Sequence, residues 1–501
     1  MRGFLATSVG VACSAALIVP LSLPSGATAA SPPVPDLPGS TQSLPLAPTG
    51  EGASDRSLGP ATEQGVTERD VRPFSLVGVV WDDVNVELHG TVEVRTRAVG
   101  SGEWSGWQDV ETHNHEHRAD PGSAESKSGK MRGSTAPLWV GASDGVEVRV
   151  RQEAAGRTPL PEGLRLELVD PGEGAADEPA LAGVPAPTNE PALAGVPAPT
   201  NEPALAGVPA PTNEPALADV PAPTNEPALA DVPAPTNEPA LADVPPSTNE
   251  PAPAGESPLP DEPAPAEEPA PANENMLPAL SREETEAELD PSALAGAVPY
   301  IGPRPAIITR KGWGADESLR EKTFVYTSSV KAAFVHHSAT GNNYTCAQAP
   351  SVLRSIYRYH VVSSGWRDFG YNFAVDKCGN IYEGRAGGVG KPVLGAHTLG
   401  FNTNSVGIAV LGTYSLSTPP PAAVTAVAKL TAWKLGLYGM NPLGKVLLTS
   451  GGSGKYAEGV KVNMNVISGH RDGYSTDCPG ALLYNRLGTA RRAAATYQGR
   501  A

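Results

Sequence analysis

The stretch FVHHSAT, residues 334–340, predicts a short apolar strand that ends in two histidines. SVGIAVLGTY (405–414) predicts a second buried strand, and VISGH (466–470) a third strand end. Helical spacing predicts three helices around these strands, at 351–366, 422–437 and 479–495. A turn at Gly379-Asn380 predicts a hairpin over 371–385. Strands interleaved with helices predict an α/β domain over residues 299–501, with a mixed central sheet flanked by helices.

Residues 71–170 show a period of two residues instead of the helical period. Apolar and polar residues alternate in TVEVRTR (91–97), VEVRVR (146–151) and LRLEL (164–168), and FSLVGVVW (74–81) is a β-rich run. Such alternation buries one face of a strand and exposes the other. The pattern predicts a small β-sandwich-like domain.

Two motifs in this β-rich region have two interpretations each. Trp104 and Trp107 could stack on sugars, but packing in a small β core is the favoured interpretation. In HNHEH (113–117), His113, His115 and His117 would share one strand face, as metal ligands do. Their acidic and amide neighbours favour a solvated loop.

The remaining segments predict export and spacing. A charged start, an apolar run from Val11 to Leu23 and an A-x-A-like site before Ser31 predict a signal peptide over residues 1–30, with no stable membrane span once it is removed. Residues 31–70 predict a flexible lead-in. Residues 171–298 predict a disordered, acidic, Pro-rich linker, with six 12-residue near-repeats over 178–249. It would carry a domain away from an attachment point, or serve as inert spacing.

Charge divides along the same boundaries. Residues 170–290 hold 1 Lys+Arg and 24 Asp+Glu, whereas residues 291–501 hold 22 and 9, a net charge of +13. A cationic extracellular domain suits an anionic wall polymer as its partner. No nucleic-acid recognition motif accompanies the charge.

The cysteines raise a question that the count alone leaves open. Signal removal leaves Cys346, Cys378 and Cys478, an odd number in an oxidising compartment, so one thiol is free or has a partner other than sulfur. Zinc in a hydrolytic site takes three protein ligands. Candidates are His336 or His337, His470 and Cys478, the last favoured as a thiolate by a following helix N-terminus; the alternative is a structural histidine and a cysteine paired elsewhere.

Five stretches then occur in order: IITRKGWGA (307–315), FVHHSAT, GWRDFGYNFAVDKCGNIYEGR (365–385), GAHTLGFNTNSVGIAVLGTY (395–414) and GHRDGYSTDCPG (469–480). Together they closely resemble the peptidoglycan recognition protein and type 2 amidase family over about residues 300–495. The resemblance implies a zinc-dependent N-acetylmuramoyl-L-alanine amidase with one Zn²⁺ ion.

The resemblance also implies roles for single residues. It makes His336, His470 and Cys478 the zinc ligands, and it leaves His337 a structural role at the strand end. Tyr371 and Thr476 become catalytic residues, although phage enzymes have lysine at the position of Thr476. Further residues match a substrate groove or a disulfide: His360, His397 and Asn402 for the groove, and Cys346 with Cys378 for the disulfide. A Cys378–Cys478 disulfide is the competing pairing, and it would abolish the site.

We therefore expect a secreted, cell-wall-associated enzyme that hydrolyses the lactyl-L-alanine amide of peptidoglycan and binds muropeptides. The alternatives are a recognition protein with the same fold that binds peptidoglycan without cutting it, and a structural wall protein.

Overall fold

The structure is a computed structural model that describes residues 38–49, 62–153, 158–173, 274–288 and 300–500. The predicted signal peptide and the twelve-residue repeats lie outside these residues. Met1–Gly183 and Ala270–Ala501 form one compact unit, which holds both predicted domains. No helix within the described ranges is long and apolar enough to cross a bilayer.

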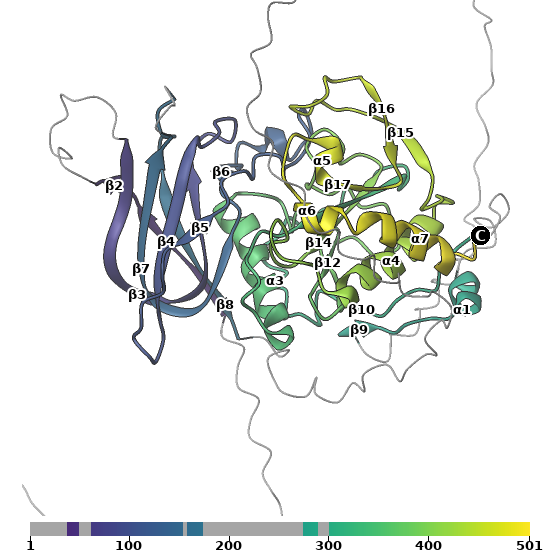
Figure 1. The fold of residues 1–501 in the computed structure, drawn as a ribbon, viewed down its shortest axis with the longest axis horizontal. Helices are drawn as coiled ribbons and strands as arrows, with labels where there is room; N and C mark the ends of the chain where they lie inside the picture. The colour runs from purple at the N-terminus through teal and green to yellow at the C-terminus, as the bar shows by residue number, and fades with distance from the viewer. Residues whose placement is uncertain (1–37, 50–61, 154–157, 174–273, 289–299, 501) are drawn as a thin grey trace, which may run out of the picture. The chain divides into compact units, whose positions relative to one another are not determined.

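The N-terminal domain is one antiparallel sheet of eight strands in the order β1-β8-β3-β7-β4-β5, with β2 and β6 paired to β3 (Figure 1). The alternating stretches lie in these strands, as predicted. The strands are β1 (Pro38–Pro45), β2 (Ala47–Pro48), β3 (Glu63–Trp81), β4 (Gly90–Ala98), β5 (Gln108–Val110), β6 (Gly133–Ser134), β7 (Leu138–Gln152) and β8 (Arg165–Gly172).

Two sequence expectations for this domain need correction. β1 and the first part of β3 fall in the stretch expected as a flexible lead-in, yet β1 pairs with β8 from Pro38↔Gly172 to Pro45↔Arg165. Neither tryptophan of the Trp104 and Trp107 pair joins the core. Both are half-buried, and the guanidinium of Arg149 lies 3.7 Å from the ring centre of Trp107.

The C-terminal domain contains a mixed sheet in the order β17-β11-β14-β12-β13-β10-β9. β11 lies parallel to β14 and β17, whereas β12 and β13 form the predicted antiparallel hairpin. The strands are β9 (Met276–Leu277), β10 (Ile307–Ile308), β11 (Ala332–His337), β12 (Phe373–Val375), β13 (Ile381–Glu383), β14 (Ser405–Val410) and β17 (Ile467–Gly469); β15 (Lys445–Thr449) and β16 (Lys461–Asn465) form a separate hairpin.

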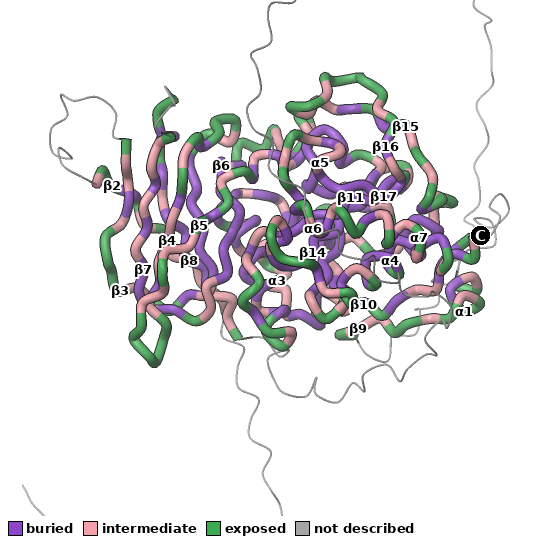
Figure 2. Tube along the Cα trace, in the orientation of Figure 1, coloured by how far each residue is buried: buried purple, intermediate pink, exposed green. Residues whose placement is uncertain are grey.

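Helices cover this sheet, and its interior strands β11 and β14 are buried along their whole length (Figure 2). The α-helices are α1 (Arg282–Ala287), α3 (Ala349–Arg358), α4 (Pro421–Gly436), α5 (His470–Gly473), α6 (Ala481–Tyr484) and α7 (Leu487–Tyr497). Residues of α4 and α7 share one hydrophobic core with the strands, and residues of α3 share another. The predicted last helix is interrupted between α6 and α7, and Pro479 precedes it.

The core around α3 also contains residues of the β domain. Leu76 and Val80 of β3 and Val169 of β8 pack in the same buried cluster as Val352 and Ile356 of α3. Gly78 of β3 lies against the side chain of Tyr359. A Cβ at this position would lie 2.4 Å from the Tyr359 hydroxyl oxygen, so a larger residue would clash. The two domains therefore meet through a continuous apolar contact.

Candidate metal centre

Two histidines meet at one edge of the mixed sheet. β11 and β17 are parallel neighbours with Val335 opposite Gly469, and His336 and His470 each follow directly. Parallel strands end at the same edge, so both imidazoles reach the same point. Both side chains are fully buried.

Cys478 returns to this edge through the turn after α5. The Arg471 backbone N–H donates to the Cys478 carbonyl at 3.0 Å, which folds the chain back. The Cys478 sulfur lies 3.7 Å from His336 Nδ1. Three of the sequence-predicted ligands are thus together.

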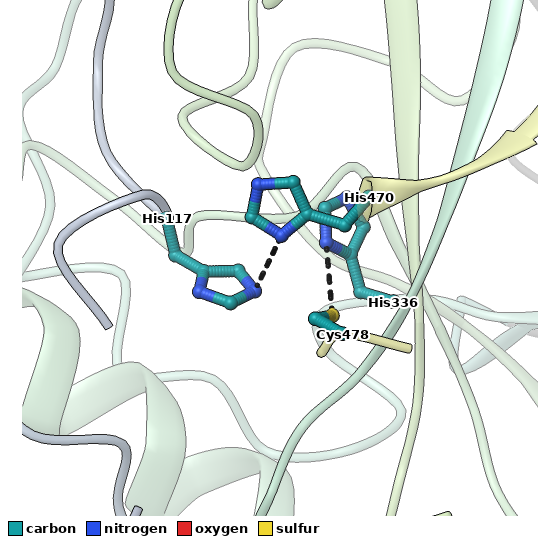
Figure 3. Close-up of side chains that lie close together, drawn as sticks. All are labelled: His117, His336, His470 and Cys478. Carbon is teal, nitrogen blue, oxygen red and sulfur yellow. Dashed lines mark hydrogen bonds between the residues drawn. The ribbon is translucent and has the colours of Figure 1, made fainter. Parts of the chain in front are cut away.

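A fourth side chain, His117, comes from the other domain. It lies between β5 and β6, and its Nε2 is 3.1 Å from His470 Nδ1 (Figure 3). The possible ligand atoms of His117, His336, His470 and Cys478 all lie within 4.8 Å of one another, and all four residues are buried. The expectation of a solvated loop at HNHEH is wrong for His117.

Two of the six separations among these atoms match a tetrahedral zinc site, and all six lie within 4.8 Å. With Zn–N near 2.05 Å and Zn–S near 2.3 Å, tetrahedral geometry separates two nitrogens by about 3.4 Å and a nitrogen from a sulfur by about 3.6 Å. The observed separations, 3.1 Å between His117 and His470 and 3.7 Å between His336 and Cys478, lie close to these values. The donor set of three imidazoles and one thiol is also one that zinc favours.

Burial sets the protonation of this cluster. Desolvation, followed by repulsion from neighbouring histidines, holds the pKa of His336 and His470 well below the usual range, so both imidazoles are neutral and ready to bind a cation. Burial also raises the pKa of the Cys478 thiol well above its usual value. The expected thiolate at a helix N-terminus is therefore not favoured without a cation, because α6 is short and burial dominates.

The hydroxyl of Thr398 orients His336 from behind. Its oxygen lies 3.4 Å from His336 Nε2 and 3.0 Å from His397 Nδ1. The Nδ1 of His336 faces the cluster, so this outer contact fixes which nitrogen is free for a metal.

Tyr371 and Thr476 lie beside the cluster. The Tyr371 ring centre is 5.2 Å from that of His336, and burial raises the pKa of its hydroxyl well above the ordinary value. Thr476 accepts a hydrogen bond from the Cys478 backbone N–H at 3.1 Å. Both line a cavity of only about 30 Å³, together with residues of the β5–β6 loop such as Glu111 and His113.

The three predicted groove residues are buried. His360 stacks on Trp366 with ring centres 4.3 Å apart, and its Nδ1 accepts from the Gly370 backbone N–H. His397 packs between the rings of Phe334 and His336. Asn402 accepts from the His397 and Thr398 backbone N–H groups and donates to the other domain at the Arg118 carbonyl.

His337 is not part of the cluster. Its Nδ1 accepts from the Tyr414 backbone N–H at 3.4 Å, which is the structural role that the sequence favoured. Cys346 and Cys378 form a disulfide, and Cys478 is free, so the competing Cys378–Cys478 pairing is excluded.

Sequence reasoning missed His117 and its neighbour Glu116. Glu116 is 3 % exposed, and desolvation raises the pKa of its carboxyl. The HNHEH motif carried the signal. The sequence could not show which histidine is a ligand, because the contact between the domains buries His117 and leaves His113 exposed.

Similar proteins fall into one group for the C-terminal domain. Residues 326–481 match the family described as N-acetylmuramoyl-L-alanine amidase, and residues 28–182 match that described as Rv3811 N-terminal galactose-binding domain-like. Peptidoglycan-recognition protein SC2 of Drosophila simulans is 33 % identical over 183 residues, which are 36 % of this chain and 85 % of the relative.

Two further proteins are similar to this chain. N-acetylmuramoyl-L-alanine amidase of Homo sapiens is 33 % identical over 192 residues, 37 % of this chain and 28 % of the relative. The solved structure of peptidoglycan recognition protein LE in complex with tracheal cytotoxin is 29 % identical, with a TM-score of 0.29, over 36 % of this chain and 92 % of that one. The family assignment depends on the sequence relatives.

Proposed function

The chain belongs to the family of peptidoglycan-recognition proteins and N-acetylmuramoyl-L-alanine amidases, and on this premise we propose that it is a zinc-dependent amidase. Its reaction would be hydrolysis of the amide between the lactyl group of muramic acid and L-alanine. The observation that carries the proposal is the cluster of His336, His470 and Cys478 beside Tyr371.

Zinc in such a site would polarise the scissile carbonyl and lower the pKa of a water molecule. His336, His470 and Cys478 would hold it. Two neutral imidazoles and one thiolate leave the site a net positive charge, which suits a developing oxyanion. Because the Cys478 thiol is protonated when buried alone, loading the site releases a proton.

Tyr371 would act as a hydrogen-bond donor. Its raised pKa keeps the hydroxyl protonated, so it can donate to the oxyanion that forms when water adds to the amide carbonyl. Thr476 would be a second, weaker donor at the same cavity. The carbon–nitrogen bond then breaks, and the amine of L-alanine leaves with a proton that the added water has given up.

We also propose that the protein acts outside the cell. The apolar run from Val11 to Leu23 and the small residues before Ser31 support export. The net charge of +13 over residues 291–501 supports attraction to an anionic wall polymer. Wall binding that does not weaken with added salt would count against this attraction.

Muropeptide release tests the activity. Purified peptidoglycan is incubated with the full chain, with and without a zinc chelator, and the products are identified by mass spectrometry. Free peptides that begin with L-alanine, lost on chelation and restored by Zn²⁺, are expected. Intact peptidoglycan in the presence of zinc-loaded protein that binds muropeptides would instead indicate a recognition protein.

A further inference from the structure

The loop between β5 and β6 covers the metal centre. We call residues 111–132 the β5–β6 segment. It belongs to the β domain, but it lies against the α/β domain along most of its length. At the cluster, His117 Nε2 lies 3.1 Å from His470 Nδ1.

Hydrogen bonds hold the segment to the α/β domain on both sides of His117. The Glu116 carbonyl accepts from the Leu399 backbone N–H at 2.9 Å, and Asp120 accepts from the Gly400 backbone N–H at 2.8 Å and from Asn402 Nδ2 at 2.6 Å. The segment therefore occupies the surface next to Asn402, one of the predicted groove residues.

A buried ion pair holds the far part of the segment. Glu125 accepts from both terminal nitrogens of Arg385, at 2.8 and 3.1 Å, and from the Arg367 backbone N–H at 3.1 Å. Both carboxylate and guanidinium are almost fully buried. Such a bidentate contact fixes orientation as well as position.

Apolar packing and a glycine complete the contact. Ala119 and Met131 share a small buried cluster with Trp366 and Ala396. A Cβ at Gly365 would lie 1.9 Å from the Lys130 carbonyl oxygen, so only glycine permits this approach. The fit indicates that the segment is built for this position.

The space that remains does not admit a muropeptide. The cavity beside Cys478 and Tyr371 has about 30 Å³, which leaves room for only a few water molecules. A larger cavity of about 360 Å³ lies farther along, and residues 119–125 of the segment form one of its walls. The same segment therefore contributes His117 to the cluster and residues 119–125 to the wall of this cavity.

The number of protein ligands decides whether a zinc site can bind water or substrate. Structural zinc sites are closed by four protein ligands, whereas catalytic sites keep one position for water or substrate. His336, His470 and Cys478 alone leave that position free. His117 fills it.

We propose that the β5–β6 segment is an autoinhibitory plug, with His117 as a displaceable fourth ligand, and that the segment must leave before substrate enters. The proposal rests on the proposed function, because it concerns the same metal. A competing interpretation is that the segment completes the active site, with Glu116 as a proton carrier. The small cavity and the closed ligand set favour the plug.

The first experiment uses the full chain loaded with Co²⁺ in place of zinc, whose visible spectrum reports the ligand set. Azide, a small anion that binds open metal positions, is then titrated. We expect the wild-type spectrum to stay unchanged. His117→Ala should show a different spectrum and saturable azide binding, and its affinity for cobalt should fall at least about tenfold. In His117→Gly, added imidazole should restore the wild-type spectrum.

Matched variants control this experiment. His115→Ala changes the same loop but not the ligand cluster, so it should behave as wild type. Glu125→Gln keeps all four ligands and weakens only the docking contact, so it should admit azide and speed hydrogen exchange in residues 111–132. This variant keeps the proposal testable should His117→Ala fail to fold.

Muropeptide hydrolysis by the same variants separates the two interpretations. A plug predicts that His117→Ala hydrolyses at least about tenfold faster than wild type and that Glu116→Gln is no slower. Slower hydrolysis by both variants would overturn the plug in favour of a completed active site. Equal azide binding by wild type and His117→Ala would overturn His117 as a ligand.

The proposed function can fail separately. If the cobalt spectra behave as expected but no variant releases peptides, the closed centre stands and the amidase proposal is wrong. If wild type hydrolyses muropeptides at the rate of His117→Ala, the amidase stands and autoinhibition is wrong.

Discussion

The two domains contribute to the candidate metal centre in different ways. The α/β domain supplies His336 and His470 from the ends of neighbouring parallel strands, with Cys478 on the turn that follows. The β domain supplies His117 from a loop held by contacts outside its own domain. The first set follows from local pattern and sheet topology, whereas the second depends on docking. Substitutions in the two domains should therefore affect activity and stability differently.

The largest contrast is expected between two members of the cluster. Cys478→Ala should release the metal and lower muropeptide hydrolysis by about 1,000-fold, which corresponds to about 4 kcal/mol of lost stabilisation. His117→Ala should change activity in the opposite direction. Zinc content by mass spectrometry and peptide release measure both. Ser475→Ala, an exposed change in the same loop, is the control; a Cys478→Ala protein that keeps full activity would refute the site.

The next effect concerns the contact between the domains. Glu125→Gln leaves the buried Arg385 without its charged partner, so the free energy of unfolding should fall by about 3–5 kcal/mol. Urea denaturation measures this change. Glu68→Gln removes an exposed pair with Arg95 and should cost at most about 1 kcal/mol. Equal effects of the two variants would mean that the domains do not depend on the Glu125 contact.

A third perturbation is confined to the α/β domain. The Cys346–Cys378 disulfide joins two residues 32 positions apart and so restricts the unfolded chain. Replacing both cysteines by alanine should therefore lower the free energy of unfolding by about 3–4 kcal/mol. Hydrogen exchange should quicken around α3 and β12 and stay unchanged in β4 and β7. Loss of protection throughout the β domain would show that the two domains unfold as one.

The smallest effect depends on pH. Burial lowers the pKa of His360 to about 3, below the value of 6.5 expected in the unfolded chain. The unfolded state therefore binds the proton more readily between these values, and stability should fall as the pH drops from 6.5 towards 3, by up to about 1.4 kcal/mol per pH unit from this residue. Urea denaturation at pH 7 and pH 5 should show a shallower loss for His360→Gln. An unchanged slope would contradict the assignment.

Much of the α/β domain was predictable because its pattern is local. Residue type and spacing alone predict two buried strands, in FVHHSAT and SVGIAVLGTY, and a helix at 422–437. Residue type and position made His470 and Cys478 candidate ligands. The choice of His336 over His337 and the disulfide came from the resemblance, and the structure brings these residues together. Local pattern could not show that burial raises the pKa of the Cys478 thiol, since that burial comes from chain segments distant in sequence.

The docking of the β domain was not predicted, although one stretch carried a signal. FSLVGVVW in β3 lacks the alternation of its neighbours, and such a run indicates a strand buried on both faces. Val77 and Val79 face the core of the β domain, while Leu76 and Val80 face α3. The sequence could not name α3 as the covering surface, because that contact joins residues more than two hundred positions apart.

The two ends of the stretch 174–273 are fastened to the same folded body. Arg354 donates to the carbonyls of Pro171 and Gly172, and the Asn275 carbonyl accepts from the Thr309 backbone N–H beside the β9–β10 pair. This stretch is thus not needed to keep the β domain in place. A protease that cuts within it would produce two bands on a denaturing gel, yet the nicked protein would elute as a single particle, its metal centre still built from both fragments.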